Sequence, residues 1–380
     1  MKILIVSHTY IAPINRDKWK ILSQKFPNTK MLIVFPKRWT TCIFAHKASI
    51  TENENTQQCS FVALETYKEG NELLYTYKHI QFLSLIRSFK PDLIHVEQGA
   101  GALSYMQANM CAKLLRLNIP TIFFTWVNWE PALSLKHKIF LSPIEKMNLN
   151  CAGGAIVGNY DARKILEKNG FKKPILVLPQ LGVNSSIFAP KKIEKKTSHT
   201  ICFIGRIIEE KGVFLLAKAF SKLAPLFPSW KLLFVGQGPC NDKLNTLIGH
   251  LGLIGRIIIQ MPVAHHEVAR ILQHTDIFVL PSQDTPTWRE QFGHVLIEAM
   301  ACKVPVIASN AGQIPYVVGK AGRIFQQGDE HSLIEHLRAL MQDEILRKKL
   351  GESGYQRVHQ HYTHEVIAEK THAFWQSMMK

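Results

Sequence analysis

The chain has 380 residues, and its 46% content of hydrophobic residues, with ordinary numbers of glycine and proline, excludes a disordered or fibrous protein and is typical of two globular domains. Its formal net charge is +17, of which about +11 lies in residues 1–185 and about +6 in the remainder. A basic surface favours polyanionic partners: nucleic acids, anionic lipid headgroups or phosphorylated small molecules. A generally basic soluble protein fits the same charge.

The seven cysteines are odd in number and widely scattered, and they form no C-x-x-C pair. This pattern argues against a disulfide framework and a zinc site, and it fits a reducing compartment. The first ten residues, MKILIVSHTY, are too short in apolar length for a signal-peptide core, and no run approaches the roughly 20 apolar residues of a membrane span. We therefore expect a cytoplasmic protein whose contact with a membrane is at most peripheral.

Short, continuous apolar runs alternate with amphipathic segments along the whole chain. Runs without strict alternation predict strands covered on both faces, and segments such as 73–89 and 213–227 predict helices between them. This alternation predicts doubly wound parallel α/β sheets. The expected strands lie within residues 2–8, 31–36, 61–65, 92–97, 121–126, 155–159 and 175–180, and then within 200–205, 231–236, 256–260, 277–282 and 304–309.

The alternation is interrupted once, at the lysine-rich segment APKKIEKKTSHT, residues 189–200, which we interpret as an interdomain linker. Two Rossmann-like domains are predicted, residues 1–185 and 186–361, and the last part of the chain is helical in pattern. Ligands of open α/β sheets bind beyond the carboxyl ends of the strands, so both domains can face an interdomain cleft.

The second domain opens with ICFIGRIIEEKGVFLLAKAF, in which a strand runs into Gly205 and Arg206 and Lys211 precedes a helix. Glycine allows close approach of a ligand, the helix start offers free N–H groups, and the two cations suit a diphosphate. A βα turn with exposed charges fits the stretch equally well. The next strand ends in Gly-Gln-Gly-Pro from Gly236, which is not a complete dinucleotide fingerprint and predicts a tight turn.

Two glutamates, Glu290 and Glu298, lie in REQFGHVLIEAMACKVPVIAS. In one straight helix they would be about 12 Å apart and about 80° out of line, beyond the roughly 5–9.5 Å of paired glycosidase carboxylates. Because PSQDTPTWREQFG predicts a loop, we expect the helix to begin near Gly293 or His294, with Glu298 in its second turn. Two carboxylates and the free N–H groups of residues 292–294 suit a polyhydroxylated ligand; a salt-bridged, structural Glu298 is the alternative.

In this order, the motifs resemble those of the retaining glycosyltransferases of family four, which have the GT-B fold. The resemblance lies in Gly205-Arg206…Lys211-Gly212, then Gly-x-Gly-Pro, then Pro281-Ser282, and finally an E-x7-E motif followed by EAMACKVPVIAS. It covers the C-terminal half throughout and the first half only in outline.

The resemblance implies a role for each matching residue. Arg206 and Lys211 would hold the donor diphosphate, Glu298 would bind the ribose, and Glu290 would contact hydroxyls of the transferred sugar. The final helix, within residues 362–380, would cross back onto the first domain. The other donor-side residues that it implies are Gly205, Gly236, Val263 near the base, and the backbone of Phe292, Gly293 and His294.

The first domain departs from the family where many members place a histidine in the cleft. Here the loop after the strand 121–126 reads VNWE, and Asn128 occupies that place. An asparagine can hydrogen-bond a sugar hydroxyl but cannot act as a base. His8, His95 and Glu97 lie at strand ends and are either structural or acceptor-side contacts.

With this resemblance, we expect transfer of a sugar, with retention of configuration, from a UDP- or GDP-sugar to a hydroxyl of a glycan or lipid-linked acceptor. Arg206, Lys211 and the helix start would stabilise the leaving diphosphate, without a metal cofactor. Polysaccharide, glycolipid or cell-surface glycan synthesis is the expected setting, with contact at an anionic inner membrane face. A non-catalytic nucleotide-sugar-binding protein and a GT-B epimerase are alternatives. A nucleic-acid partner is not expected, because no nucleic-acid-binding module is recognisable.

Overall fold

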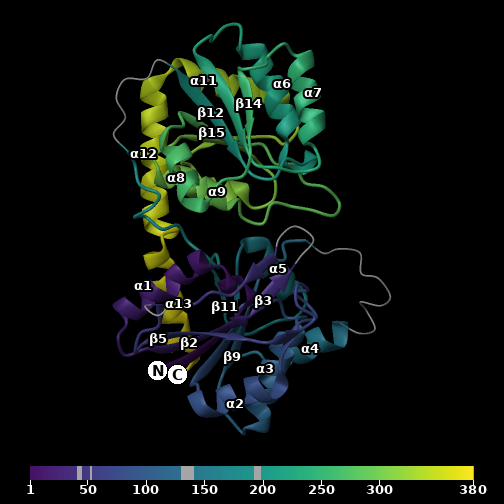
Figure 1. Ribbon diagram of the computed structural model, residues 1–380, viewed down its shortest axis with the longest axis vertical. Helices are drawn as coiled ribbons and strands as arrows, with labels where there is room; N and C mark the ends of the chain where they lie inside the picture. Colours follow the sequence, from purple (N-terminus) through teal and green to yellow (C-terminus); the bar gives the residue numbers. More distant parts are fainter. Residues whose placement is uncertain (41–44, 52–53, 130–140, 192–197, 380) are drawn as a thin grey trace. The chain divides into compact units, whose positions relative to one another are not determined.

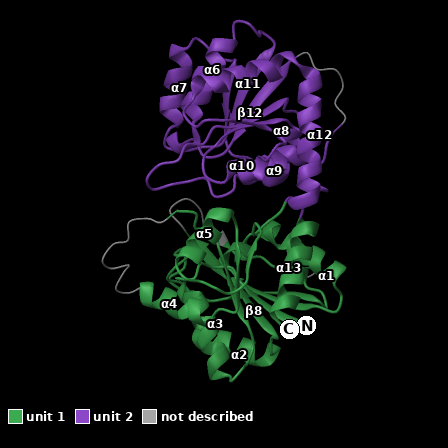
Figure 2. Ribbon diagram, turned by 180° about the vertical axis from the view of Figure 1, so that it is seen from behind, with its two compact units in different colours: residues 1–182, 364–380 green, residues 183–363 purple. Residues whose placement is uncertain are grey.

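The computed structural model describes residues 1–40, 45–51, 54–129, 141–191 and 198–379 (Figure 1). The chain forms two compact units, residues 1–182 with 364–380 and residues 183–363 (Figure 2). The expected linker, 189–200, therefore lies inside the second unit, and its residues 192–197 lie outside the described residues. Residues before it belong to the second unit because the Val183 N–H donates to the Tyr362 carbonyl at 2.9 Å and the Phe188 side chain is fully buried.

The first unit is built on a seven-stranded parallel sheet of order β11-β10-β9-β8-β1-β2-β5. Each strand coincides with one of the predicted apolar runs, and the burial of Ile3 to Val6 on both faces of β1 explains why the run does not alternate. The strands are β1 (Lys2–Val6), β2 (Lys30–Pro36), β5 (Cys59–Leu64), β8 (Leu93–Val96), β9 (Thr121–Thr125), β10 (Gly154–Val157) and β11 (Ile175–Val177).

Helices cover this sheet, and the last helix of the chain belongs to the same unit. The rings of Trp19 in α1 and Trp375 in α13 stack with centroids 5.6 Å apart, and both are fully buried. No helix among the described residues is both long and apolar enough to cross a membrane. The helices are α1 (Asp17–Lys25), α2 (His79–Phe89), α3 (Leu103–Leu114), α4 (Ser142–Cys151), α5 (Tyr160–Lys168) and α13 (His364–Met378), preceded by the short 3-10 helices η1 (His8–Ile11) and η2 (Pro13–Arg16).

The helix expected over 73–89 is wrong in its first third. The buried Tyr75 and Tyr77 give this part an alternating pattern, and it forms β7 (Thr76–Tyr77), paired with β6 (Thr66–Tyr67). A second antiparallel pair, β3 (Arg38–Thr40) and β4 (Ala45–Lys47), was not predicted because its strands are short and polar.

The second unit is a six-stranded parallel sheet of order β14-β13-β12-β15-β16-β17. Five of its strands were predicted, whereas β17 has too few apolar residues to be recognised. The strands are β12 (His199–Ile204), β13 (Trp230–Val235), β14 (Ile257–Gln260), β15 (Ile277–Leu280), β16 (Val306–Ser309) and β17 (Arg323–Phe325). The helices are α6 (Val213–Leu223), α7 (Asn241–His250), α8 (His265–Gln273), α9 (His294–Ala301), α10 (Ile314–Val318), α11 (Glu330–Gln342) and α12 (Glu344–His361), with the short 3-10 helix η5 (Glu209–Lys211).

Two parallel-sheet α/β units confirm the predicted fold class. In the second unit the strand order reverses at β12, which lies between β13 and β15. Ligands of open α/β sheets bind at such a switch point, outside the carboxyl ends of the strands. This directs attention to the loops that follow β12, β13 and β15.

Candidate functional site

The loops after β12 and β13 are packed backbone against backbone, and this requires glycine. Gly236 has φ of +148°, and a Cβ atom there would lie 1.9 Å from the Gly205 carbonyl oxygen. A Cβ atom at Gly238 would lie 2.3 Å from the carbonyl oxygen of Ile207. The Asn241 N–H donates to the Gly238 carbonyl at 3.1 Å, so the predicted tight turn is confirmed at the end of the Gly-Gln-Gly-Pro stretch, which packs against the loop that carries Arg206.

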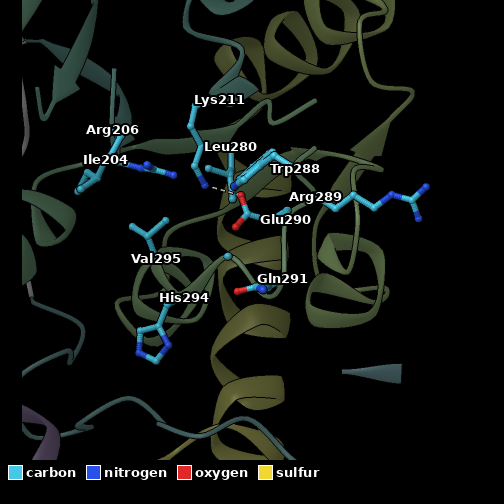
Figure 3. Close-up of a pocket in the computed structure, with 12 residues that line it drawn as sticks. Ile204, Arg206, Lys211, Leu280, Trp288, Arg289, Glu290, Gln291, His294 and Val295 are labelled. Atoms are coloured by element: carbon cyan, nitrogen blue, oxygen red, sulfur yellow. Dashed lines mark hydrogen bonds and ion pairs between the residues drawn. The ribbon is translucent and has the colours of Figure 1, made fainter. Parts of the chain in front are cut away.

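A pocket of about 360 Å³ opens beside this loop, within the second unit (Figure 3). It brings together six of the predicted donor-side residues, Gly205, Arg206, Lys211, Glu290, Gly293 and His294. The sequence analysis had not selected the others that line it, which are Ile204, Leu280, Trp288, Arg289, Gln291 and Val295.

Two of the predicted groups, Lys211 and Glu290, are bound to each other. The Lys211 Nζ lies 2.5 Å from the Glu290 Oε2, and the Ser282 hydroxyl donates to the same oxygen at 2.9 Å. Only 14% of the Lys211 side chain and 9% of the Glu290 side chain are exposed, so the pair is largely shielded from water. The Trp288 ring centroid lies 4.9 Å from Nζ and covers the ammonium. Any anion that binds Lys211 must therefore compete with Glu290.

The second glutamate, Glu298, is buried in α9, and its partner is a histidine. The helix begins at His294 with Gly293 as its N-cap at φ +77°, which confirms the expected start. Glu298 is 6% exposed, and the His265 Nε2 donates to its Oε1 at 2.8 Å. The His294 Nε2 lies 3.9 Å from the same oxygen. The structure thus gives Glu298 an imidazole partner within ion-pair distance, which fits the alternative of a salt-bridged, structural glutamate as well as a ligand-binding one.

Glu298 and three other predicted donor-side residues lie outside the pocket lining. The Phe292 side chain is 7% exposed and packs edge-on against Tyr362 at 5.6 Å, so only its backbone is placed to meet a ligand. Val263 is half-buried in the loop between β14 and α8. Gly236 acts through its close approach to Gly205.

In the first unit, Glu97 is the centre of a buried polar network. The Lys18 Nζ lies 2.9 Å from its Oε1, the Gln180 amide donates to Oε2 at 2.9 Å, and the Tyr10 hydroxyl also donates to Oε2. Burial opposes ionisation of this carboxyl, but the Lys18 ammonium and the hydrogen bonds prevail and lower the pKa of Glu97. This network favours the structural alternative for Glu97.

The surroundings of His95 also favour the structural alternative, because its side chain is 1% exposed and lies edge-on to the rings of Trp19 and Trp375. Burial lowers the pKa of His95 to about 4. His8 stacks on Trp39 at 4.5 Å and keeps 19% of its side chain exposed, so it can still contact a ligand. Asn128 is 1% exposed in the loop after β9.

The sequence around the site residues that were not predicted gives little indication of what they contact. Trp288 lies in an irregular loop two residues before Glu290, and its contact with Lys211 bridges 77 positions of sequence. His265 is one of two adjacent histidines at the start of α8, and nothing in AHHEV shows which one meets Glu298. Both were hidden because their partners are distant in the chain.

The chain is similar in sequence to known glycosyltransferases. Residues 185–357, nearly all of the second unit, match the family described as glycosyl transferases group 1. An uncharacterized glycosyltransferase of Methanocaldococcus jannaschii is 25% identical over 357 residues, covering 81% of this chain and 86% of that protein. The capsular polysaccharide biosynthesis glycosyltransferase CapM of Staphylococcus aureus is 27% identical over 252 residues, covering 62% of this chain and 65% of CapM.

Solved structures show the same fold over the whole chain. Sucrose-phosphate synthase from Thermosynechococcus elongatus superposes with a TM-score of 0.71 at 18% identity, covering 100% of this chain and 99% of that one. Anabaena HepE, solved in complex with UDP and glucose, gives a TM-score of 0.69 at 16% identity, covering 99% and 100%. The chain has the GT-B fold, and the matched family and relatives support a glycosyltransferase.

Proposed function

We propose that the protein is a retaining glycosyltransferase that moves a sugar from a UDP- or GDP-sugar to an acceptor hydroxyl during polysaccharide, glycolipid or cell-surface glycan synthesis. The observation that carries the proposal is the pocket at the end of β12, where Arg206, Lys211 and the start of α9 surround Glu290. CapM acts in capsular polysaccharide biosynthesis, and HepE was solved with UDP and with UDP-glucose, which supports the same donor class here.

In this proposal the cations neutralise the diphosphate as it leaves. Arg206 offers a forked donor and Lys211 a point charge, and the N–H groups at the start of α9 add to them. Donor binding exchanges the Lys211–Glu290 contact for one between Lys211 and a phosphate oxygen. The released Glu290 carboxylate then accepts hydrogen bonds from sugar hydroxyls, while Glu298 takes the ribose and Val263 lies near the base.

Retention follows from a front-face route in which the leaving phosphate itself accepts the proton of the incoming hydroxyl. Because the charge of the leaving group is met by protein cations, we expect activity without a metal cofactor, and chelation with EDTA should leave it unchanged. On the acceptor side, Asn128 and His8 are the side chains that we propose for contact with a glycan or lipid-linked acceptor, and Asn128 would donate or accept a hydrogen bond without acting as a base.

We also propose that the protein is cytoplasmic and contacts an anionic membrane face through its first unit. The helices α2 and α3 contain no acidic residue, and they expose Ile80 at 85%, Met110 at 59% and Leu114 at 70%. Apolar side chains on a basic surface suit the boundary between anionic headgroups and acyl chains.

A panel of UDP-, GDP- and ADP-sugars, scored by thermal shift and by slow donor hydrolysis, tests the proposed function. We expect one nucleotide sugar to raise the melting temperature and to be hydrolysed with the anomeric configuration retained. Binding without hydrolysis or transfer would favour the non-catalytic alternative, and a change of sugar configuration without an acceptor would favour an epimerase. Salt-dependent RNA binding with no response to any sugar nucleotide would refute the proposal.

A further inference from the structure

The contact between His265 and Glu298 fixes the direction of the buried carboxylate. His265 is the first residue of α8, and its Nε2 lies 2.8 Å from the Glu298 Oε1 across 33 positions of sequence. The other side of the imidazole is held by Phe188, which is fully buried and lies edge-on with ring centroids 4.9 Å apart. The ring thus contacts Phe188 on one side and Glu298 on the other, with 38% of the His265 side chain exposed.

This arrangement leaves one carboxylate oxygen for a ligand. His265 donates to Oε1, and the nearest second nitrogen, the His294 Nε2, is also on the Oε1 side at 3.9 Å. Among the described residues, none donates a hydrogen bond to the Glu298 Oε2. The Lys211–Glu290 pair does not fix its carboxylate in the same way, because a lysine ammonium has three donors on a flexible stem. Lys211 and Ser282 both donate to the same oxygen, the Glu290 Oε2.

A carboxylate fixed in this way suits a vicinal diol. Each oxygen of an ionised carboxylate can accept two hydrogen bonds, so two neighbouring hydroxyls can both donate to Oε2 when it faces them, and a hydrogen bond to a charged group is stronger than one between neutral groups. If the carboxylate were free to rotate, the entropy cost of ordering it on binding would offset part of the free energy gained from the two hydroxyls.

We propose that His265 is a positioning residue that holds Glu298 toward the 2′- and 3′-hydroxyls of the donor ribose, so that the preference of the protein for ribonucleotides depends on His265. This inference rests on the proposed function, which assigns the ribose to Glu298. His265 itself would not contact the reacting sugar. Its loss should therefore lower the affinity for the donor and leave the rate of the chemical step unchanged.

The test compares the affinity for a ribonucleotide with that for its 2′,3′-dideoxy analogue. The probe is whichever of UDP, GDP and ADP the wild-type protein binds most tightly, measured by calorimetry together with its dideoxy form. The variants are His265→Phe, which keeps a flat ring beside Phe188 but removes the N–H, and His265→Gln, which keeps a donor. The matched control is His266→Gln, because His266 is the next residue and is exposed.

We expect the wild-type protein and the His266→Gln control to prefer the ribonucleotide by about 10- to 100-fold, the size of a charged hydrogen bond. His265→Phe should reduce the preference to about threefold or less by weakening only the ribonucleotide, and His265→Gln should restore part of it. A preference unchanged in both His265 variants overturns the inference, as does an equal loss for both nucleotides, which would mark a merely structural residue. A wild-type protein that binds nucleotides without any ribose preference refutes the role of Glu298 itself, and one that binds no nucleotide refutes the proposed function.

Discussion

The Glu290→Gln variant separates the two tasks that we assign to this carboxylate. The substitution keeps the shape of the side chain and removes its charge. In the free protein, Oε2 accepts from both the Lys211 ammonium and the Ser282 hydroxyl, at 2.5 and 2.9 Å. A hydrogen bond to a charged group contributes about 1.5–3 kcal/mol, and the glutamine keeps a hydrogen bond to Ser282, so we expect the free energy of unfolding to fall by about 2 kcal/mol.

The effects of Glu290→Gln on binding and on transfer should have opposite signs. Loss of the carboxylate frees Lys211, so the affinity for a free nucleoside diphosphate should stay the same or rise. Loss of the charged hydrogen bonds to the sugar should lower kcat/KM for transfer or donor hydrolysis by about 10- to 150-fold. Calorimetry with the nucleoside diphosphate and a coupled assay of nucleotide release measure the two quantities.

The control for this variant is Glu335→Gln in α11 of the same unit, where the side chain is half exposed and pairs with Arg338 on the surface. It should change neither quantity, because exposed pairs contribute little. If Glu290→Gln weakens the nucleoside diphosphate as much as it slows transfer, Glu290 serves to place Lys211, and its proposed contact with the sugar is wrong.

Three further predictions concern stability and the membrane. Burial holds the pKa of His95 at about 4 against 6.5 in the unfolded chain, so the unfolded state binds this proton first and the stability falls by up to about 3 kcal/mol as pH decreases from 6.5 to 4. His95→Phe should remove that part of the slope in urea unfolding at pH 7 and 4.5, and an unchanged slope contradicts this. Gly236→Ala should lower the free energy of unfolding by about 1–3 kcal/mol, measured by thermal unfolding. The control Gly249→Ala, whose Cβ would meet open space in α7, should not, and equal effects of the two variants would contradict the close approach of Gly236 to Gly205. Replacing Met110 and Leu114 by serine should weaken binding to anionic vesicles at least tenfold without affecting nucleotide binding, and unaltered vesicle binding would exclude this surface.

The sheet strands were predictable because a strand that is buried on both faces is a continuous apolar run in the sequence. Residues 3–6 and 277–280 are apolar throughout and are buried on both faces of the sheet. β17 was not predicted because it lies at the edge of the sheet and has only three residues, Arg323 to Phe325, too few to form a recognisable apolar run. The segment 73–89 was wrongly predicted as one helix because it is amphipathic, although Tyr77 belongs to β7 and the buried Tyr75 directly precedes that strand.

The site was predictable only as far as its motifs are contiguous. The glycines, the two cations and the start of α9 follow from βα turns that can be read along the chain. The partners of the charged groups could not be read in this way, because Lys211 and Glu290 are 79 positions apart and His265 and Glu298 are 33 apart. Sequence spacing locates charges at a strand end, and only the packing of neighbouring loops decides which of them neutralise one another.

In the mechanism that we propose, the different partners of the two glutamates allow the protein to distinguish a sugar nucleotide from its product. A nucleoside diphosphate without a sugar can draw Lys211 away from Glu290, but it then leaves a largely buried carboxylate without its cation, which is unfavourable. An intact donor supplies the phosphate for Lys211 and hydroxyls for Glu290 together. Recognition of the sugar is thereby coupled to recognition of the diphosphate. In the proposed mechanism, we expect the Lys211–Glu290 pair to re-form after transfer and assist release of the nucleotide, whereas Glu298 should keep its contact with His265.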